Sequence, residues 1–457
     1  MTAARVPALV LTVLVALPPM VRAQGAPAPD ADPRVQRLVA AVSEPRLRAL
    51  ATTLVAFGTR ESLSTTASPT RGIGAARQWI FDELTRSSAR LQVSFDTHVI
   101  APQGRFPRQT ELRNVMAVLP GRTARRIYVT GHYDSLNLGN GGQQALNAAG
   151  GQNPQARADF DHDAEAPGAN DDGSGTVLTM ELARVFAESG LQFDATLVFI
   201  GWAGEEQGLV GSAAHAQALA AAKVPVEANF NNDIVGNIRG GNGVIDAETV
   251  RIYSVGPEDS LSRSLARYVA REAALYVPSH RIRLMAREDR FGRGSDHSSF
   301  TRQGFPAIVF REANENFAKQ HTAADTLEGV DFGYLAQNAR VNAAAAASLA
   351  LAPPAPRVTN DGGQNLLTRG LSGYDAQLRW AASAGAVAYR ISWRDTWTND
   401  WQHRQTVGNV TEFVLPQVSI DDFVFGVAAV SADGHESLTS AYVSPVRQGA
   451  DVKVVKQ

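Results

Sequence analysis

The hydrophobic positions along residues 34–351 follow two alternating periodicities. Short apolar runs are typical of buried strands, and they occur at Leu91–Ile100, Asn114–Leu119, Arg126–Thr130, Thr196–Trp202, Val226–Ile234, Val250–Val255 and Ala307–Arg311. Apolar residues at helical spacing predict helices at Arg34–Ala56 (with a second helix from about Glu44), Gly72–Ser88, Ser174–Glu188, Ser212–Ala222, Ser260–Ala274 and Phe332–Leu351. This alternation predicts an α/β fold in which helices flank a central sheet.

The pattern changes at the proline-rich segment 351–356. Beyond it the helical spacing stops, and short alternating runs occur at Ala376–Ala381, Ala388–Trp393, Glu412–Val418, Phe423–Val430 and Ser440–Val443. Such runs, separated by turn residues, are typical of a small all-β sandwich. We therefore expect a first domain over residues 34–352 and a second over residues 353–450.

The apolar residues of the second domain resemble the core of a fibronectin type III domain. They are Trp380, Tyr389, Trp393, Leu415, Phe423, Phe425 and Val427. Phe423 stands where that family usually has Tyr, so the resemblance implies that the corner hydrogen bond of the Tyr is missing. The expected partner of this domain is a surface, a polysaccharide or the first domain itself.

The first 23 residues have the pattern of a secretory signal peptide. Arg5 precedes the apolar run Ala8–Leu17, and Val21 and Ala23 are the small residues of a cleavage site. The run is shorter than the roughly 20 residues that a membrane span needs. The Ala/Pro-rich residues 24–33 predict a flexible leader. We expect a bacterial protein that is exported to the periplasm or the medium and does not span a membrane.

Composition excludes several functions. The chain has 43 basic and 45 acidic side chains and a net charge of −2, which disfavours nucleic acid or an anionic membrane as its main partner. It has no Cys, which excludes disulfides, thiolate metal sites and cysteine nucleophiles. Any metal must therefore be held by His, Asp or Glu.

Acidic or imidazole side chains gather in five short motifs near the ends of predicted strands or the start of a helix. The motifs are Gly131–Ser135, Gly168–Gly175, Trp202–Gly208, Asn231–Asp233 and Gln320–Thr322. Each alone has an ordinary explanation, such as a helix N-terminus or a solvated turn. Together they would lie at one edge of one sheet, where α/β proteins carry their sites.

The motifs supply two His, four Asp and two Glu. Nitrogen and oxygen ligands of this mixture suit zinc or a similar divalent ion. Not every carboxylate is needed to bind metal, and a hydrolase needs a general base. Side chains diverge beyond a strand end, so one of the adjacent Glu205 and Glu206 can bind metal while the other faces water.

In their order and intervals, these motifs resemble the co-catalytic zinc aminopeptidases of metallopeptidase family 28, over about residues 34–350. The resemblance implies a mixed central sheet of zinc exopeptidase type and two Zn²⁺ ions per chain. It implies that His132 and Asp233 bind one ion, that Glu206 and His321 bind the other, and that Asp171 bridges both.

The resemblance also assigns the remaining roles. Glu205 would be the general base, Asp134 would orient His132, and the peptide bond from Asp171 to Asp172 would be cis. The expected substrate is a peptide or protein with a free N-terminus. Water between the two metals would attack the scissile carbonyl after Glu205 removes its proton.

Some residues depart from the family pattern. Gln320 stands where relatives often carry a Tyr that stabilises the oxyanion, and Tyr133 is one candidate replacement. The Asp and His of Ser295–His297 match a segment that is structural in the family, so we leave them out of the metal set. The long loop over residues 135–169 is typical of a lid or a binding segment.

Three alternatives stay open at this stage. A glutaminyl cyclase would use the same fold with one zinc and no peptide hydrolysis. A carboxypeptidase would need a cationic clamp, for which Arg287, Arg290, Arg293 and Arg311 are candidates. A non-catalytic, receptor-like protein would have lost ligands or the base, whereas this sequence retains them all.

Overall fold

The computed structural model describes residues 31–140, 142 and 160–443. The expected signal peptide and residues 24–30 of the expected leader lie outside these ranges, as do much of the 135–169 loop and the end of the second domain. Helix α1 begins at Pro33, so the last residue assigned to the leader belongs to a helix.

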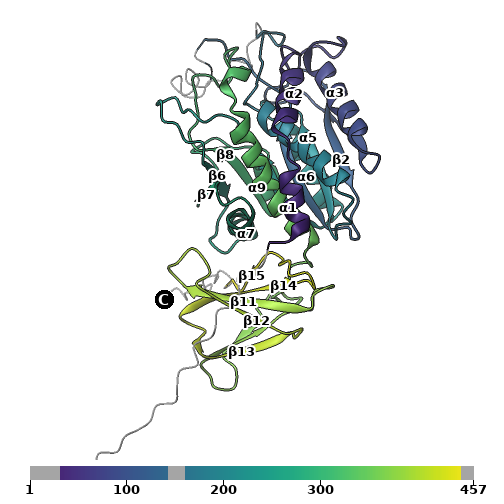
Figure 1. Ribbon diagram of the computed structural model, residues 1–457. Coiled ribbons are helices and arrows are strands. Elements are labelled where there is room, and N and C mark those ends of the chain that lie inside the picture. The colour runs from purple at the N-terminus through teal and green to yellow at the C-terminus, as the bar shows by residue number, and fades with distance from the viewer. Residues whose placement is uncertain (1–30, 141, 143–159, 444–457) are drawn as a thin grey trace, which may run out of the picture. The chain divides into compact units, whose positions relative to one another are not determined.

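A mixed sheet of eight strands organises the first part of the chain (Figure 1). Its strands are β1 (Gln92–Ile100), β2 (Thr110–Leu119), β3 (Arg126–His132), β4 (Thr196–Trp202), β5 (Val226–Asn232), β6 (Thr249–Ser254), β7 (Arg281–Met285) and β8 (Ala307–Glu312). They lie in the order β1-β2-β4-β3-β5-β8-β6-β7. Strand β4 lies between β2 and β3, and β8 lies between β5 and β6, so two strands insert between strands that precede them in the chain.

Strand directions support the predicted mixed sheet. At its centre, β4, β3, β5 and β8 run parallel to one another. The pairs β1–β2, β2–β4 and β8–β6 are antiparallel. Central parallel strands are covered on both faces, which explains why β3 and β4 are almost continuously buried. Their carboxyl ends meet at one edge of the sheet.

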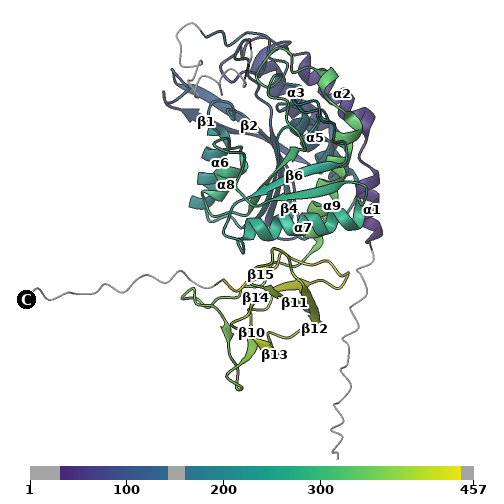
Figure 2. The same cartoon turned by 90° about the vertical axis from the view of Figure 1, so that its left-hand side faces the viewer.

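Helices cover both faces of this sheet. Helices α1 (Pro33–Ala40), α2 (Glu44–Val55), α3 (Gly72–Ser87), α5 (Gly173–Glu188), α7 (Leu261–Tyr276) and α9 (Phe332–Leu351) contribute to the largest hydrophobic cluster. Helices α6 (Val210–Ala221) and α8 (His297–Thr301) pack with a separate cluster and lie across the sheet from α5 and α9 (Figure 2). Within the described ranges, no helix combines the length and apolarity that a membrane span requires.

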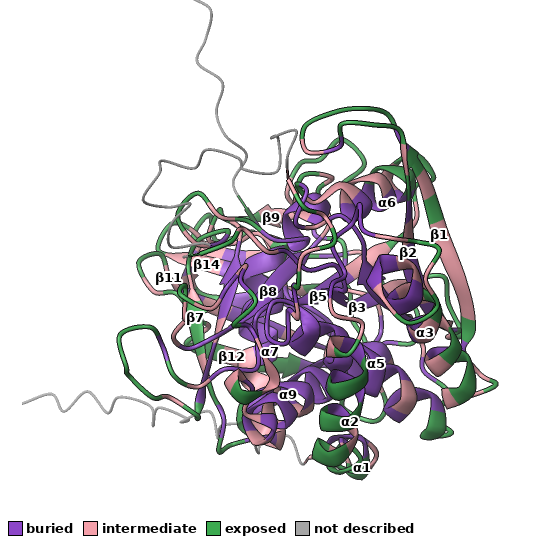
Figure 3. Ribbon diagram, turned by 90° about the horizontal axis from the view of Figure 1, so that it is seen from above, coloured by how far each residue is buried: buried purple, intermediate pink, exposed green. Residues whose placement is uncertain are grey.

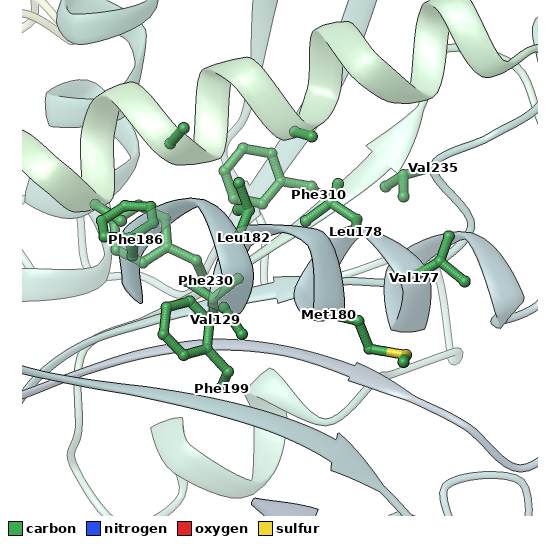
Figure 4. Close-up of a cluster of buried hydrophobic side chains, with 14 of the residues drawn as sticks. Val129, Val177, Leu178, Met180, Leu182, Phe186, Phe199, Phe230, Val235 and Phe310 are labelled. Atoms are coloured by element: carbon green, nitrogen blue, oxygen red, sulfur yellow. The ribbon is translucent and has the colours of Figure 1, made fainter. Parts of the chain in front are cut away.

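The main core lies between α5, α9 and the parallel strands. Leu182 and Phe186 of α5 pack near Val129, Phe199 and Phe230, which come from β3, β4 and β5 (Figure 4). All five side chains are fully buried. Figure 3 shows that burial is concentrated in these central elements, while α1 and α2 keep exposed outer faces. The core thus holds the carboxyl ends of β3, β4 and β5 in fixed positions.

Most element predictions match the structure to within a few residues. The limits of α9 and β4 are those expected, and β3 extends two residues further, to His132. Strand β7 and the short helix α8 were not predicted. Strand β7 has only five residues, three of which are exposed at the edge of the sheet, so its apolar pattern is too short to indicate a strand by itself.

The C-terminal part forms two antiparallel sheets, as expected. One contains β13 (Glu412–Ser419), β10 (Asp375–Arg379) and β9 (Leu367–Thr368), and the other contains β12 (His403–Val407), β11 (Ala388–Asp395), β14 (Phe423–Val430) and β15 (Ser440–Ala441). Buried side chains from both sheets, such as Leu378, Leu415, Tyr389 and Val427, belong to one hydrophobic cluster. The two sheets therefore share a core, which is the defining feature of a sandwich.

Candidate metal centre

The five predicted ligands come together at the carboxyl edge of the parallel strands. His132 is the last residue of β3, and Asp233 directly follows β5. Glu206 lies in the turn after β4, Asp171 lies just before α5, and His321 lies in the loop after β8. Four of the five are buried, and His321 is nearly so, with 11 % of its side chain exposed. The sheet topology thus gathers residues that are far apart in sequence.

Asp171 lies between the two histidines. Its Oδ1 is 3.4 Å from Nε2 of His132, and its Oδ2 is 3.1 Å from Nε2 of His321. Nε2 of His321 is also 3.1 Å from Oε2 of Glu206. On the other side, Nε2 of His132 is 3.9 Å from Oδ1 of Asp233. The Asp171 carboxylate therefore points one oxygen toward His132 and the other toward His321.

Three groups of side chains could hold a metal ion: one joins His132, Glu205 and Glu206, and the other two share Asp171. His132, Asp171 and Asp233 form one of these two, and Asp171, Glu206 and His321 form the other, with the potential ligand atoms of each group within 4.8 Å of one another. Oε1 of Glu206 and Nδ1 of His321 are buried without a hydrogen-bond partner. These side chains fit a pair of divalent ions of the zinc type.

The electrostatics of the cluster also favour cations. Burial opposes protonation of His321, yet Glu206 and Asp171 raise its pKa from 6.5 to about 10. Burial raises the pKa of Glu205 well above its usual range, and the nearby Glu206 and Asp233 raise it further. Carboxylates this close to one another need positive charge to remain ionised. Two divalent cations would supply that charge.

Glu205 lies beside the cluster and not within either ligand group that contains Asp171. Its Oε2 is 3.9 Å from Nε2 of His132, and 12 % of its side chain is exposed. It lines a cleft of about 360 Å³ together with Asp171, Glu206, Asp233 and His321. The cleft gives Glu205 access to a molecule bound over the cluster, as a general base requires.

Asp172 holds three elements at the site. Its side chain accepts hydrogen bonds from the backbone N–H groups of His132 at 3.0 Å, Gly175 at 2.8 Å and Ile234 at 3.2 Å. It therefore caps α5 and also ties the ends of β3 and β5 to it. The peptide bond from Asp171 to Asp172 is cis, as the family resemblance implies.

Asp134 supports more of the site than the sequence predicted. Nδ1 of His132 lies 3.1 Å from the backbone oxygen of Asp134 and 3.5 Å from its Oδ1. The Asp134 carboxylate also accepts hydrogen bonds from the backbone N–H groups of Glu205 at 3.2 Å and Glu206 at 3.1 Å. One buried side chain thus fixes both the first histidine and the turn that carries the two glutamates.

Two buried charged residues near the ligands were missed by sequence analysis. Asp325 accepts hydrogen bonds from the backbone N–H groups of Asn170 at 3.1 Å and Asp171 at 2.9 Å. Arg60 donates to the backbone oxygens of Tyr133 and Gly168, at 2.6 Å and 2.8 Å. Both bind backbone atoms, so no spacing rule would have revealed them, although Asp325 does lie four residues after His321.

Arg311 pairs with a predicted ligand. Its Nη1 and Nη2 donate to Oδ1 and Oδ2 of Asp233 at 3.0 Å and 2.9 Å, and its Nε donates to Asp289 at 3.2 Å. Burial alone would raise the pKa of Asp233, but Arg311 and His132 hold it well below its usual range. Arg311 is fully buried in this pair and is therefore unavailable as the clamp of a carboxypeptidase.

The structure also decides the status of several other candidates. Tyr133 is fully buried and donates its hydroxyl to the backbone oxygen of Arg113 at 2.7 Å, so it cannot replace the missing oxyanion Tyr. Asp296 and His297 are buried outside both ligand groups. Arg287 does not line the cleft, whereas Arg290 and Arg293 do.

The fold and the site define an α/β metallohydrolase whose paired ligand sets lie beyond the ends of parallel strands. Comparison with known proteins identifies the family. The profile of Peptidase family M28 matches residues 114–346. A protein of Pyricularia oryzae named "Probable zinc metalloprotease" is 39% identical over 451 residues, which cover 90% of this chain and 84% of the relative. The chain belongs to peptidase family M28 and is a zinc metallopeptidase.

Solved structures show the same fold. The Legionella pneumophila LapA aminopeptidase aligns with a TM-score of 0.52 at 21% identity, over 72% of this chain and 78% of LapA. A Porphyromonas gingivalis glutaminyl cyclase aligns with a TM-score of 0.51 at 17% identity, over 66% of this chain and 96% of the cyclase. At these identities the similarity shows only that the fold is shared, and proteins with this fold include both an aminopeptidase and a glutaminyl cyclase.

Proposed function

We propose that this protein is an aminopeptidase that removes N-terminal residues from peptides with two zinc ions held by His132, Asp233, Asp171, Glu206 and His321. The observation that carries the proposal is the position of Asp171, which presents Oδ1 to His132 and Oδ2 to His321. A carboxylate with both oxygens committed in this way suits two neighbouring ions and not one.

The residues of the chain divide the chemistry among themselves. The two ligand groups that share Asp171 would hold zinc, which would supply a Lewis acid for the scissile carbonyl and acidify the attacking water. Glu205 accepts the proton of the attacking water and returns it to the leaving amine. Asp134 positions Glu205 through its backbone N–H, at 3.2 Å from Oδ1. With zinc bound, the ligand cluster would accept the uncharged α-amine of a free N-terminus, which would favour cleavage of the N-terminal residue.

A glutaminyl cyclase is the second candidate, because a cyclase of the same fold aligns well with this chain. A one-zinc cyclase would need only one of the two ligand groups. Here both groups are complete, which supports the hydrolase instead.

We further propose that the chain is exported through residues 1–23 and that its C-terminal sandwich is of the fibronectin type III kind. The signal-peptide pattern and the shared core of the two C-terminal sheets support these proposals. Curated relatives that are 36–39% identical to this chain are fungal, so they lend no support to the expected bacterial origin.

The proposal is tested with a panel of aminoacyl-p-nitroanilides and their N-acetylated counterparts. Activity is measured before chelation, after chelation and after zinc is returned, and bound zinc is counted by metal analysis. We expect cleavage of the free-amine substrates only, loss of activity on chelation and recovery with two zinc ions per chain. Cleavage of the acetylated substrates, or full activity with one ion, would contradict the proposal.

A further inference from the structure

The cleft over the ligand cluster is lined by basic as well as acidic side chains. Four arginines line it together with the carboxylates of the cluster, and they are Arg105, Arg290, Arg293 and Arg302. Under the proposed function Asp171, Glu206 and Asp233 bind metal and Glu205 acts as the base. The arginines are then the charged side chains of the cleft lining that have no assigned role.

The four arginines differ in how fully their charge is already used. Arg290 donates to Glu315 at 2.5 Å and lies 3.4 Å from Asp289. Arg105 donates to the backbone oxygen of Glu206. Arg302 is exposed at the surface, and no ion pair joins it to another described residue.

Arg293 is held beside the final ligand loop. Its Nη2 donates to Oε1 of Gln320 at 3.0 Å, and its guanidinium lies 4.9 Å from the ring centre of Phe317. Gln320 precedes His321, so these contacts hold the guanidinium next to the cluster. Its Nη1 is buried without a hydrogen-bond partner and is 3.8 Å from Glu315.

The charge of Arg293 is poorly compensated. Glu315 is its nearest acid, but that carboxylate is already bound by Arg290 at 2.5 Å and Arg251 at 2.7 Å. Burial and the neighbouring Arg290 lower the pKa of Arg293 to about 10. A half-buried guanidinium with a spare donor is best satisfied by an anionic ligand, because Arg binds carboxylates through two parallel hydrogen bonds.

We propose that Arg293 and Arg302 select substrates that carry a carboxylate close to the scissile peptide bond. This inference rests on the proposed function, since the ligand cluster marks where that bond lies. The cleft of about 360 Å³ suits a dipeptide or the first residues of a short peptide. The carboxylate is either the C-terminal α-carboxylate of a dipeptide or the side chain of an acidic residue beside the bond.

Two matched substrate pairs distinguish these sources. Leu-Leu and Leu-Leu-amide differ only in the terminal carboxylate, and Glu-p-nitroanilide and Gln-p-nitroanilide differ only in the side chain. Each pair is measured as kcat/KM with the zinc-loaded protein and with the Arg293→Gln and Arg302→Gln variants. Arg287→Gln is the control, because Arg287 is exposed nearby but does not line the cleft.

In at least one pair, we expect kcat/KM for the substrate that carries the carboxylate to exceed that of its neutral partner by about tenfold or more. This is the effect of one hydrogen bond between charged groups. The ratio of the two kcat/KM values should fall toward one in the Arg302→Gln and Arg293→Gln variants and should stay at the wild-type value in Arg287→Gln. High salt should weaken the preference. A preference in the dipeptide pair would place the carboxylate on the leaving side, and one in the anilide pair would place it on the N-terminal residue.

Equal rates within both pairs would overturn the inference while leaving aminopeptidase activity intact. A preference that survives both cleft substitutions would overturn it as well. Calorimetric binding of Leu-Leu and Leu-Leu-amide to the zinc-loaded Glu205→Gln protein gives a readout that needs no turnover. If no free-amine substrate is cleaved by the wild type, the proposed function fails, and the binding comparison still decides whether the arginines select a carboxylate.

Discussion

At the scale of single residues, the site depends on side chains that bind backbone atoms as much as on those that face the cleft. Asp172 accepts from His132, Gly175 and Ile234, and Asp134 accepts from both glutamates of the turn after β4. These hydrogen bonds hold the ligands in position in the folded protein, so metal binding does not have to order them.

Replacement of Glu205 by Gln separates catalysis from metal binding. Gln keeps the shape of the side chain but cannot accept a proton, and Glu205 belongs to neither ligand group that shares Asp171. We expect kcat to fall by about 10²- to 10⁴-fold, the usual contribution of a general base. Metal analysis should still find the wild-type zinc content. Near wild-type turnover would show that another group takes the proton.

Glu315 should make the stability of the protein depend on acid pH. Burial alone would raise its pKa, but Arg290, Arg311 and Arg251 lower it from 4.5 to about 2. Because the folded pKa is depressed, the stabilisation is fully present above about pH 4.5 and is lost as the pH falls toward 2. A shift of this size corresponds to roughly 3 kcal/mol.

The measurement compares denaturant unfolding of the wild type and Glu315→Gln from pH 7 to pH 2. The variant should be less stable at pH 7, and the difference should shrink below pH 4.5. Glu248→Gln is the control, because Glu248 pairs with Arg281 at the exposed surface and its loss should change stability by less than about 0.5 kcal/mol. If the difference in unfolding free energy between the wild type and Glu315→Gln stays constant with pH, the lowered pKa of Glu315 is refuted.

At the scale of elements, the close approach of α5 to the sheet decides where Asp171 and Asp172 lie. A Cβ atom on Gly175 would lie 2.1 Å from the backbone oxygen of Asn232, and one on Gly131 would lie 2.6 Å from the backbone carbon of Gly175. Only glycine allows the first turn of α5 to sit this close to the ends of β3 and β5.

A Gly175→Ala substitution tests this packing. The methyl group meets backbone and the Asp172 carboxylate, which cannot move aside easily, so the start of α5 must shift. We expect a loss of about 1–3 kcal/mol in unfolding free energy, together with weaker zinc binding. Gly408→Ala is the control, since nothing lies within 4 Å of an added Cβ there. Equal zinc affinity in both variants would show that the site tolerates the shift.

At the scale of the whole molecule, the metal centre draws ligands from segments that span residues 132 to 321. Ions bound there would cross-link the ends of three strands, a helix start and a loop. Zinc that binds only the folded chain stabilises it by mass action, by about 2.7 kcal/mol at 100 times its dissociation constant.

Removal of zinc should therefore lower the melting temperature. For a domain of this size, a loss of about 2–3 kcal/mol in the free energy of unfolding lowers the melting temperature by a few degrees. Calorimetric scans with zinc and after chelation measure the shift. The shift should be much smaller in His132→Ala, whereas His403→Ala, far outside the ligand groups, should behave as the wild type. A melting temperature unaffected by chelation would argue against metal bound at this site.

Much of the fold followed from local patterns, and the failures are informative. Strand β4 is almost entirely apolar, β3 contains the apolar run 127–129, and α9 is long and rich in Ala, so their positions were predictable. The edge strand β7 alternates Arg with Ile and Leu and is mostly exposed, so its pairing with β6 depends on a partner and not on its own sequence.

The sequence by itself determined the kind of chemistry that is open to this protein: nitrogen and oxygen side chains that suit a metal, and the family pattern of their order and spacing. Tertiary structure alone decided what surrounds them. Arg311 on Asp233, Asp325 on the backbone before α5 and the arginines of the cleft come from separate segments. Charge pairing and burial act through space, and only the folded chain brings those partners within a few ångströms of one another.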